Sequence, residues 1–313
     1  VDRALVIAGS DRRGTVYGIY ELSKQMGVSP WYWWMDVPVV KRTDVYAKQG
    51  SYTDGEPAVK YRGIFLNDEA PCLTSWVKNT YGTNYGDHNF YARVFELILR
   101  LKGNYLWPAM WGWAFYADDP ENGKTADEMG VCIGTSHHEP MARNHQEYAR
   151  NRKAYGEWNY ATNPEGLNRF FREGIERMKG TEDVVTIGMR GDGDAAMGGE
   201  EGKDHEYTPQ FEKNMKLMES IFQNQRRIIK EVTGRPAKET PQMWAPMMSS
   251  CCCATTTGAT CGACPTPRNG SIPAAGACIT TWTTWAHRAT PSGSTSPRYK
   301  TCGNSCNSPT TMA

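Results

Sequence analysis

The chain has 313 residues, of which 22% are charged, and a formal net charge of +1. This length can hold one large barrel or two ordinary domains. The charge balance predicts no nucleic-acid or anionic-membrane partner, and no apolar run approaches the length of a membrane span.

The first 36 residues are predicted to be the end of a small α/β domain. Residues 4–8 are apolar enough for a short buried strand, and a helix with an apolar side follows as far as Met26. Ser10 or Asp11 can cap this helix, and Gly27 can end it. Because the chain begins at Val1 rather than Met, we interpret its start as a cut, with any signal peptide upstream. We expect the longer parent protein to be secreted or periplasmic.

Four aromatic residues follow in the run P-W-Y-W-W at residues 30–34. Such a cluster is costly to expose, so it either packs a domain interface or forms a wall for sugar stacking. We favour the interface. Residues 37–59 are predicted to be a linker.

From residue 60 the chain repeats a unit of strand, polar strand end and helix, which predicts a parallel sheet with right-handed crossovers. The predicted strands are 62–66, 105–107, 131–135, 184–189 and 242–245, and the predicted helices are 90–101, 164–178 and 208–232. Every predicted strand before residue 240 is followed by polar, charged or Trp side chains that could bind a substrate or transfer a proton. This layout predicts an incomplete (β/α)8 TIM-type barrel over residues 60–245, with its active site at the C-terminal ends of the strands.

Paired carboxylates with nearby aromatic rings are typical of glycoside hydrolysis, in which one carboxylic acid protonates the leaving oxygen and a second carboxylate activates water or attacks the sugar. Five acidic residues at strand ends are candidates: Asp68, Glu69, Glu139, Asp192 and Asp194. Each of them alone could also be a solvated loop charge.

Three further strand-end features could contact a substrate or a metal. His137 and His138, with Asp194, could serve a metal-dependent barrel hydrolase, but Ala142 breaks the H-E-x-x-H zinc pattern. The Arg190 guanidinium could bind a substrate carboxylate through two parallel hydrogen bonds, or it could form a salt bridge within its own loop. Trp111 could stack on a sugar ring, whereas Trp107 is expected to pack in the core. Because sugar stacking does not require catalysis, a non-catalytic carbohydrate-binding role is an alternative for the chain.

The composition changes abruptly after residue 245. Eight of the ten Cys lie between Cys251 and Cys306, no acidic residue follows Glu239, and residues 251–313 contain no Leu, Val or Phe. Such a segment cannot bury enough apolar surface to offset its conformational entropy, so residues 246–313 are predicted to be an irregular, non-native tail. When residues 246–260 are back-translated and read one base out of frame, they can give P-D-D-V-I-V-L-L-C-D-D-N-W-G-N, a plausible barrel strand. We therefore interpret the tail as out of frame.

Several long motifs resemble glycoside hydrolase family 115, the xylan α-1,2-glucuronidases. They include S-P-W-Y-W-W, Y-R-G-I-F-L-N-D-E-A-P, G-N-Y-L-W-P-A-M-W, I-G-T-S-H-H-E-P-M and M-R-G-D-G-D, and the resemblance runs over residues 1–245. It implies removal of glucuronic acid or its 4-O-methyl ether from glucuronoxylan by inversion, without a cofactor. By the matching motifs, the residues lining the uronate pocket would be Asp68, Trp111, His137 and Arg190, with Asp192 or Asp194 supplying a carboxylate to the chemistry.

The chain departs from the family after Ala245, where a segment with a Y-K-E motif should follow. The Glu of that motif is our candidate for the general acid. Its absence predicts that this polypeptide is inactive. The fragment is also predicted to be unstable, because a barrel without its later strands has open edges and an exposed core.

Overall fold

A computed structural model describes residues 4–46, 48–67, 70–108, 111–197, 209–244 and 278–281. The chain divides into two units, Val1–Trp282 and Thr283–Ala313, and all described residues lie in the first. Asp68, Glu69 and most of the predicted out-of-frame tail lie outside the described residues.

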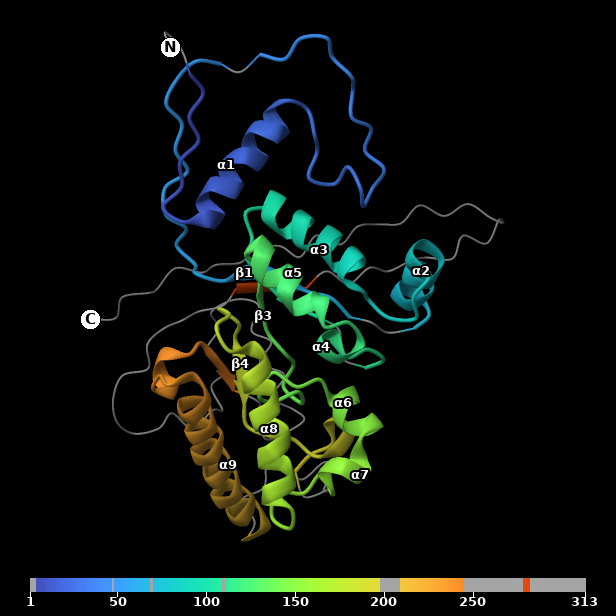
Figure 1. Ribbon diagram of the computed structural model, residues 1–313, viewed down its shortest axis with the longest axis vertical. Helices are drawn as coiled ribbons and strands as arrows, with labels where there is room; N and C mark the ends of the chain where they lie inside the picture. The colour runs from blue at the N-terminus through green and yellow to red at the C-terminus, as the bar shows by residue number, and fades with distance from the viewer. Residues whose placement is uncertain are drawn as a thin grey trace, which may run out of the picture. The chain divides into compact units, whose positions relative to one another are not determined.

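The strands are short and run parallel (Figure 1). One sheet has the order β3-β2-β1-β6, built from β1 (Arg62–Phe65), β2 (Tyr105–Trp107), β3 (Cys132–Ile133) and β6 (Cys278–Thr281). A second sheet pairs β4 (Val185–Ile187) with β5 (Gln242–Trp244). An isolated parallel bridge between Gly134 and Val184 joins the two sheets. The strands β1 to β5 therefore lie side by side in chain order, as β/α units require.

The described strands do not close into a ring, so the architecture that the structure shows is mixed α/β with parallel strands rather than a complete barrel. All five strands expected between residues 60 and 245 are present, although β1, β3 and β4 are shorter than expected. Because the strands are parallel neighbours, their C-terminal ends gather the following loops at one edge.

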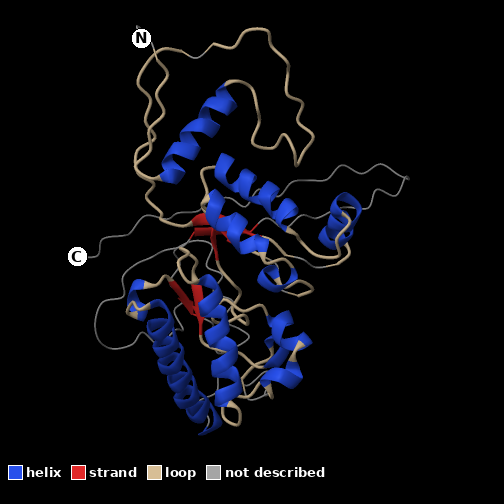
Figure 2. Cartoon of the chain, viewed as in Figure 1, coloured by secondary structure: helices blue, strands red, loops and turns tan. Residues whose placement is uncertain are grey.

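Helices form most of the regular structure (Figure 2). The α-helices are α1 (Arg12–Gln25), α2 (Cys72–Tyr81), α3 (His88–Arg100), α4 (Phe115–Asp118), α5 (Glu121–Met129), α6 (His145–Arg150), α7 (Arg152–Tyr155), α8 (Pro164–Met178) and α9 (Pro209–Thr233); the 3₁₀ turns are η1 (Asp192–Asp194) and η2 (Ala237–Glu239). None of the described helices has the length and apolar character needed to cross a bilayer.

The helices α1, α3 and α8 begin at residues whose side chains cap the helix. The Asp11 side chain accepts from Gly14 N (2.7 Å) at the start of α1, which confirms one of the two predicted caps. Asp87 does the same for α3 by accepting from Phe90 N at 2.9 Å. At α8, Asn163 caps the helix and Pro164 occupies the first turn, where a missing N–H costs nothing. These local contacts explain why the sequence pattern located α1, α3 and α8, whereas it did not predict α2 or the helices α4 to α7.

A continuous apolar core lies between the helices and the sheets. The buried face of α8 includes Phe170, Phe171 and Ile175, and it belongs to the same cluster as Val185 and Ile187 of β4. Parallel strands buried on both faces need such helical cover. The core thereby anchors the strand β4, whose C-terminal end leads into the polar loop described below.

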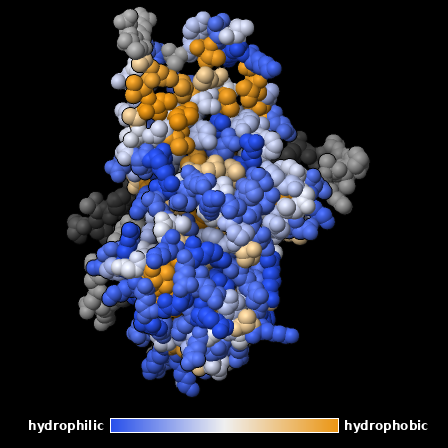
Figure 3. Space-filling model, viewed as in Figure 1, coloured by the Kyte–Doolittle hydropathy of each residue, from blue (hydrophilic) through white to orange (hydrophobic). Residues whose placement is uncertain are grey.

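The N-terminal segment differs from its prediction. Residues 4–8 form no strand, and Leu5 and Val6 are 68% and 79% exposed. An apolar run becomes a strand only when a neighbouring strand accepts its hydrogen bonds, and none of the described strands pairs with it. Orange residues gather around α1 in Figure 3. The exposed apolar side chains of this part of the chain include Ile19 and Met26.

The aromatic run at residues 30–34 packs against the helices α2 and α3. The Trp34 ring lies 5.5 Å from that of Trp76 and 6.2 Å from that of Phe90, and its indole N–H donates to Arg93 O at 3.2 Å. Arg93 also covers the Trp33 ring at 4.6 Å. Among residues 37–59, the described ones form no helix or strand.

The tail also departs from its prediction at one place. Residues Cys278–Thr281 form β6 and pair in parallel with β1, with Arg62 opposite Cys278 and Phe65 opposite Thr281. The open edge of β1 offers backbone donors and acceptors, and β-branched residues such as Ile279 suit an extended strand. The remainder of the tail lies outside the described residues.

Candidate functional site

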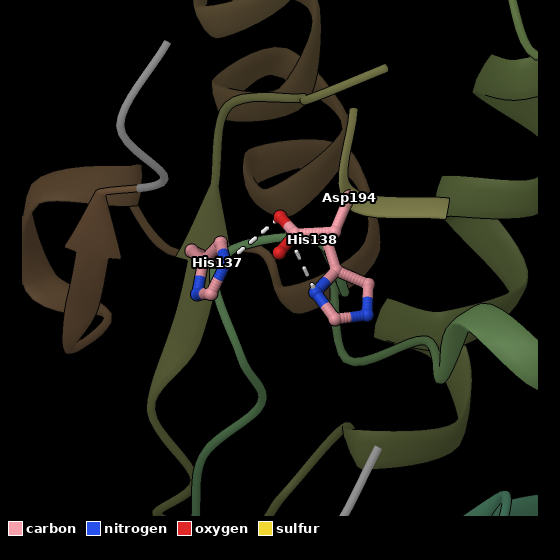
Figure 4. A group of neighbouring side chains, drawn as sticks. All are labelled: His137, His138 and Asp194. Atoms are coloured by element: carbon pink, nitrogen blue, oxygen red, sulfur yellow. Dashed lines mark ion pairs between the residues drawn. The ribbon is translucent and has the colours of Figure 1, made fainter. Parts of the chain in front are cut away.

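Two polar loops meet at the C-terminal ends of β3 and β4. His137 and His138 follow β3, and Asp194 follows β4. The Asp194 Oδ1 atom lies 2.9 Å from His137 Nε2 and 3.8 Å from His138 Nδ1. In Figure 4 the two imidazoles flank the Asp194 carboxylate. Residues 57 positions apart in the sequence are therefore brought into direct contact, as their shared place at strand ends predicted.

The backbone around η1 presents Asp194 to the histidines. Gly193 and Asp194 both adopt positive φ, at 63° and 70°. Gly193 reaches this region without steric cost, whereas Asp194 is a residue type that tolerates it. The loop closes on itself through a hydrogen bond from Gly191 N to Ala195 O of 2.9 Å. The turn fixes where the carboxylate lies.

Arg190 holds the same carboxylate from the interior. Its side chain is only 3% exposed, its Nε lies 2.7 Å from Asp194 Oδ1, and its Nη2 donates to Asp194 O at 2.9 Å. The loop salt bridge considered for Arg190 is therefore present, and the guanidinium acts on Asp194. Arg190 O in turn accepts the indole N–H of Trp158 at 2.9 Å.

His138 is enclosed by aromatic rings. Its side chain is 1% exposed and lies 5.2 Å from the Trp111 ring and 5.6 Å from the His145 ring, measured between centroids. Burial lowers the pKa of His138 to about 3, and the Asp194 charge opposes that shift only in part. His138 is therefore a neutral imidazole at neutral pH, while its neighbour His137 is 21% exposed to solvent.

Glu139 lies inside the protein and supports the loop. Its carboxylate accepts from Ser136 N at 3.1 Å, from Asn144 Nδ2 at 3.1 Å and from His145 N at 3.3 Å. Burial raises the pKa of Glu139 to about 7 in spite of these donors. Because the residue is fully buried, its role is to tie the β3 loop to the start of α6.

A second pair of groups surrounds Asp192. His145 Nε2 lies 3.2 Å from Asp192 Oδ1, and Arg152 binds both carboxylate oxygens, with Nη2 donating to Oδ1 at 3.0 Å. The Arg152 hydrogen bond is the main reason that the pKa of Asp192 lies below its usual value. Asp192 is 39% exposed and is therefore an ionised carboxylate at the edge of the site.

The structure brings together most of the site residues that the sequence indicated. Asp192, Asp194, His137, His138 and Arg190 gather around the two loops, and Trp111 joins them through its ring contact with His138. Trp111 is 40% exposed, whereas Trp107 is 8% exposed and packs on Phe65, as expected for a core residue. Asp68 and Glu69 follow β1, outside the described residues.

Sequence reasoning missed His145 and Arg152. A usable signal existed, because Asn144 and Glu147 form a capping box that starts α6 at His145. That pattern would have placed His145 in the first turn of a helix. Arg152 has no comparable signal, since its contact with Asp192 depends on how α7 packs beside the β4 loop.

Carboxylates, imidazoles and an exposed indole at the C-terminal ends of parallel β/α strands are the side chains that hydrolases of polar, ring-shaped substrates use. The comparisons agree with this class. The chain belongs to glycosyl hydrolase family 115, whose family model matches residues 54–250.

One similar solved structure is that of BtGH115A, a family GH115 4-O-methyl-α-glucuronidase with specificity for decorated arabinogalactans. The two are 34% identical with a TM-score of 0.68, over 77% of this chain and 31% of that one. The chain thus spans less than a third of the length of this neighbour. Among curated proteins, no match was found.

Proposed function

We propose that the site belongs to an α-glucuronidase that removes α-1,2-linked glucuronic acid or its 4-O-methyl ether from xylan with inversion. The observation that carries the proposal is the cluster of Asp194, His137 and Arg190 at the strand ends of a family 115 chain. The 4-O-methyl-α-glucuronidase activity named for the similar structure supports the choice of sugar. That neighbour does not support xylan as the polymer that bears the sugar, because its specificity is for decorated arabinogalactans.

In this mechanism Asp194 or Asp192 is the carboxylate that activates water. Inversion requires a general base on one face of the sugar and a general acid on the other. Arg152 lowers the pKa of Asp192, so Asp192 suits the role of an ionised base. Asp194 is the alternative because its carboxylate lies beside His137 at the strand ends. His137 is the partly exposed group that can reach a substrate hydroxyl or carboxylate, and Trp111 offers its exposed ring face to the sugar.

The general acid is not among these groups. Glu139 has a raised pKa but is fully buried, so no leaving oxygen can reach its carboxyl group. No Asp or Glu side chain follows Glu239, so the tail cannot supply one. No described site residue therefore suits the general acid, and Asp68 and Glu69 lie outside the described residues. We propose that the acid belongs to the Y-K-E segment that family 115 carries after the position of Ala245 and that this sequence lacks, so that the polypeptide does not cleave natural glucuronoxylan.

This proposal can be tested with substrates of different leaving-group ability. A glucuronyl fluoride needs no protonation of its leaving group, so a site with a base and no acid can hydrolyse the fluoride but not xylan. We expect fluoride release that is lost in Asp194→Asn or Asp192→Asn, and no glucuronate release from glucuronoxylan or from glucuronidated arabinogalactan. Glu212→Gln, on the exposed surface of α9, is the matched control.

Three results would change the conclusion. Glucuronate release from xylan by the chain would refute the proposal that it lacks a general acid. Release from arabinogalactan alone would replace the proposed polymer. Saturable glucuronate binding without hydrolysis of the fluoride would indicate a carbohydrate-binding role instead.

A further inference from the structure

The donor atoms of His137, His138 and Asp194 lie within 4.8 Å of one another. Two imidazoles and one carboxylate that converge from different loops are a donor set that zinc, cobalt, nickel and iron(II) accept. A cluster of this kind differs from an exposed acidic patch, because two of its three donors are nitrogen ligands. These three side chains are drawn together in Figure 4.

We infer that His137, His138 and Asp194 form a binding site for a divalent transition-metal ion. The ligands are fixed before the ion arrives. His138 is 1% exposed and held between the rings of Trp111 and His145, and Asp194 is held by Arg190 and by its turn. Binding therefore requires little ordering of side chains, which is the condition for a preorganised site.

Access for the ion comes from the solvent side. The side chains of His137 and Asp194 are 21% and 24% exposed, so an ion can enter and keep water at its remaining coordination positions. Three protein ligands with water in an open position is an arrangement that zinc uses in catalytic sites.

The same contacts set the selectivity and the strength of binding. Magnesium and calcium prefer oxygen ligands, so two imidazoles disfavour them relative to zinc, cobalt or nickel. The Arg190 guanidinium, 2.7 Å from Asp194 Oδ1, repels a divalent ion and competes for the carboxylate. The site should therefore bind transition metals reversibly rather than hold a permanent structural ion.

Metal binding would block sugar chemistry at the same place. An ion on Asp194 removes the lone pair that a general base needs and occupies the face that His137 offers to a substrate. This consequence rests on the proposed function, whereas ion binding itself does not. The ion therefore acts as an inhibitor that excludes the sugar.

Binding can be measured on the full chain by equilibrium dialysis and by Co²⁺ absorption. The Cys residues must first be alkylated, because the Cys-rich tail is a competing metal ligand; thiolate charge-transfer bands would report incomplete blocking. We expect one Co²⁺ per chain, displaced by Zn²⁺ but not by Mg²⁺. His137→Ala should weaken binding by about tenfold or more.

His88→Ala is the matched control, because His88 pairs with Asp119 at 2.7 Å, outside the cluster. Circular dichroism of His137→Ala checks that the partly exposed substitution preserves the fold. Unchanged Co²⁺ binding in His137→Ala, equal loss in His88→Ala, or no binding at millimolar Co²⁺ would overturn the inference. None of these readouts depends on glucuronide cleavage, so failure here is distinguishable from failure of the proposed function.

Discussion

Replacing Asp194 by Asn tests how strongly the two loops of the site depend on one carboxylate. Asn keeps the size of the side chain and tolerates the positive φ of 70°, so the backbone adds little strain. The change removes the negative charge that faces Arg190 Nε at 2.7 Å and His137 Nε2 at 2.9 Å. Arg190 is 3% exposed and cannot turn to solvent without opening the core.

The magnitude follows from the burial of the pair. Removing one partner of a buried ion pair costs about 3 to 5 kcal/mol, because the remaining charge stays desolvated. Asp194 is 24% exposed, so solvent screens part of the interaction, and Arg190 keeps its bond to Asp194 O. We therefore expect the free energy of unfolding to fall by about 2 to 3 kcal/mol.

Urea unfolding followed by tryptophan fluorescence measures this loss as a lower midpoint at an unchanged slope. Glu212→Gln removes an exposed i,i+4 pair with Lys216 and should leave the midpoint unchanged. A cycle that adds Arg190→Met should show a coupling of more than about 1 kcal/mol with Asp194→Asn. A midpoint for Asp194→Asn equal to that of the control would refute the reasoning, as would additive effects in the cycle.

The remaining predictions concern buried groups away from the ion pair. Burial raises the pKa of Asp183 to about 6 from 3.8, so its stabilising contribution is present below about pH 4 and is lost as the pH rises to 6. Asp183→Asn should thus raise the free energy of unfolding at pH 7 by up to about 3 kcal/mol. In urea titrations the variant's free energy of unfolding should also vary less between pH 4 and 6 than that of the unsubstituted chain; parallel pH curves for the two proteins would contradict this. A Cβ at Gly174 would lie 2.1 Å from Met141 O, so Gly174→Ala should lower the urea midpoint of unfolding. Gly123→Ala is the control, because its Cβ would lie 3.3 Å from the Tyr116 ring and should change the midpoint little. Equal midpoints for the two variants would exclude the clash at Gly174. Leu106→Ala should cost about 3 kcal/mol in the same assay, because the side chain is fully buried in β2; a loss below about 1 kcal/mol would show that the strand is not packed as described.

Local signals in the sequence determined the elements that build the site. The α8 helix was predicted at its observed bounds because Asn163, Pro164 and an apolar face all act within the segment. The strand β2 was located equally well by its short apolar run between turn residues. Since every such strand carries polar residues at its C-terminal end, the sequence also indicated that His137 and Asp194 lie near each other.

Only the tertiary structure decided how each of these residues is used. His137, His138 and Glu139 are adjacent in sequence, yet the first is partly exposed, the second is neutral among aromatic rings and the third is buried among backbone and side-chain donors. The pairing of Arg152 with Asp192 and the strand β6 on the edge of β1 likewise depend on distant segments. Burial and partner charges are set by long-range packing, and the pKa and reach of a side chain follow from them. A sequence pattern can therefore place a residue at a strand end, but it cannot assign its protonation state or its partners.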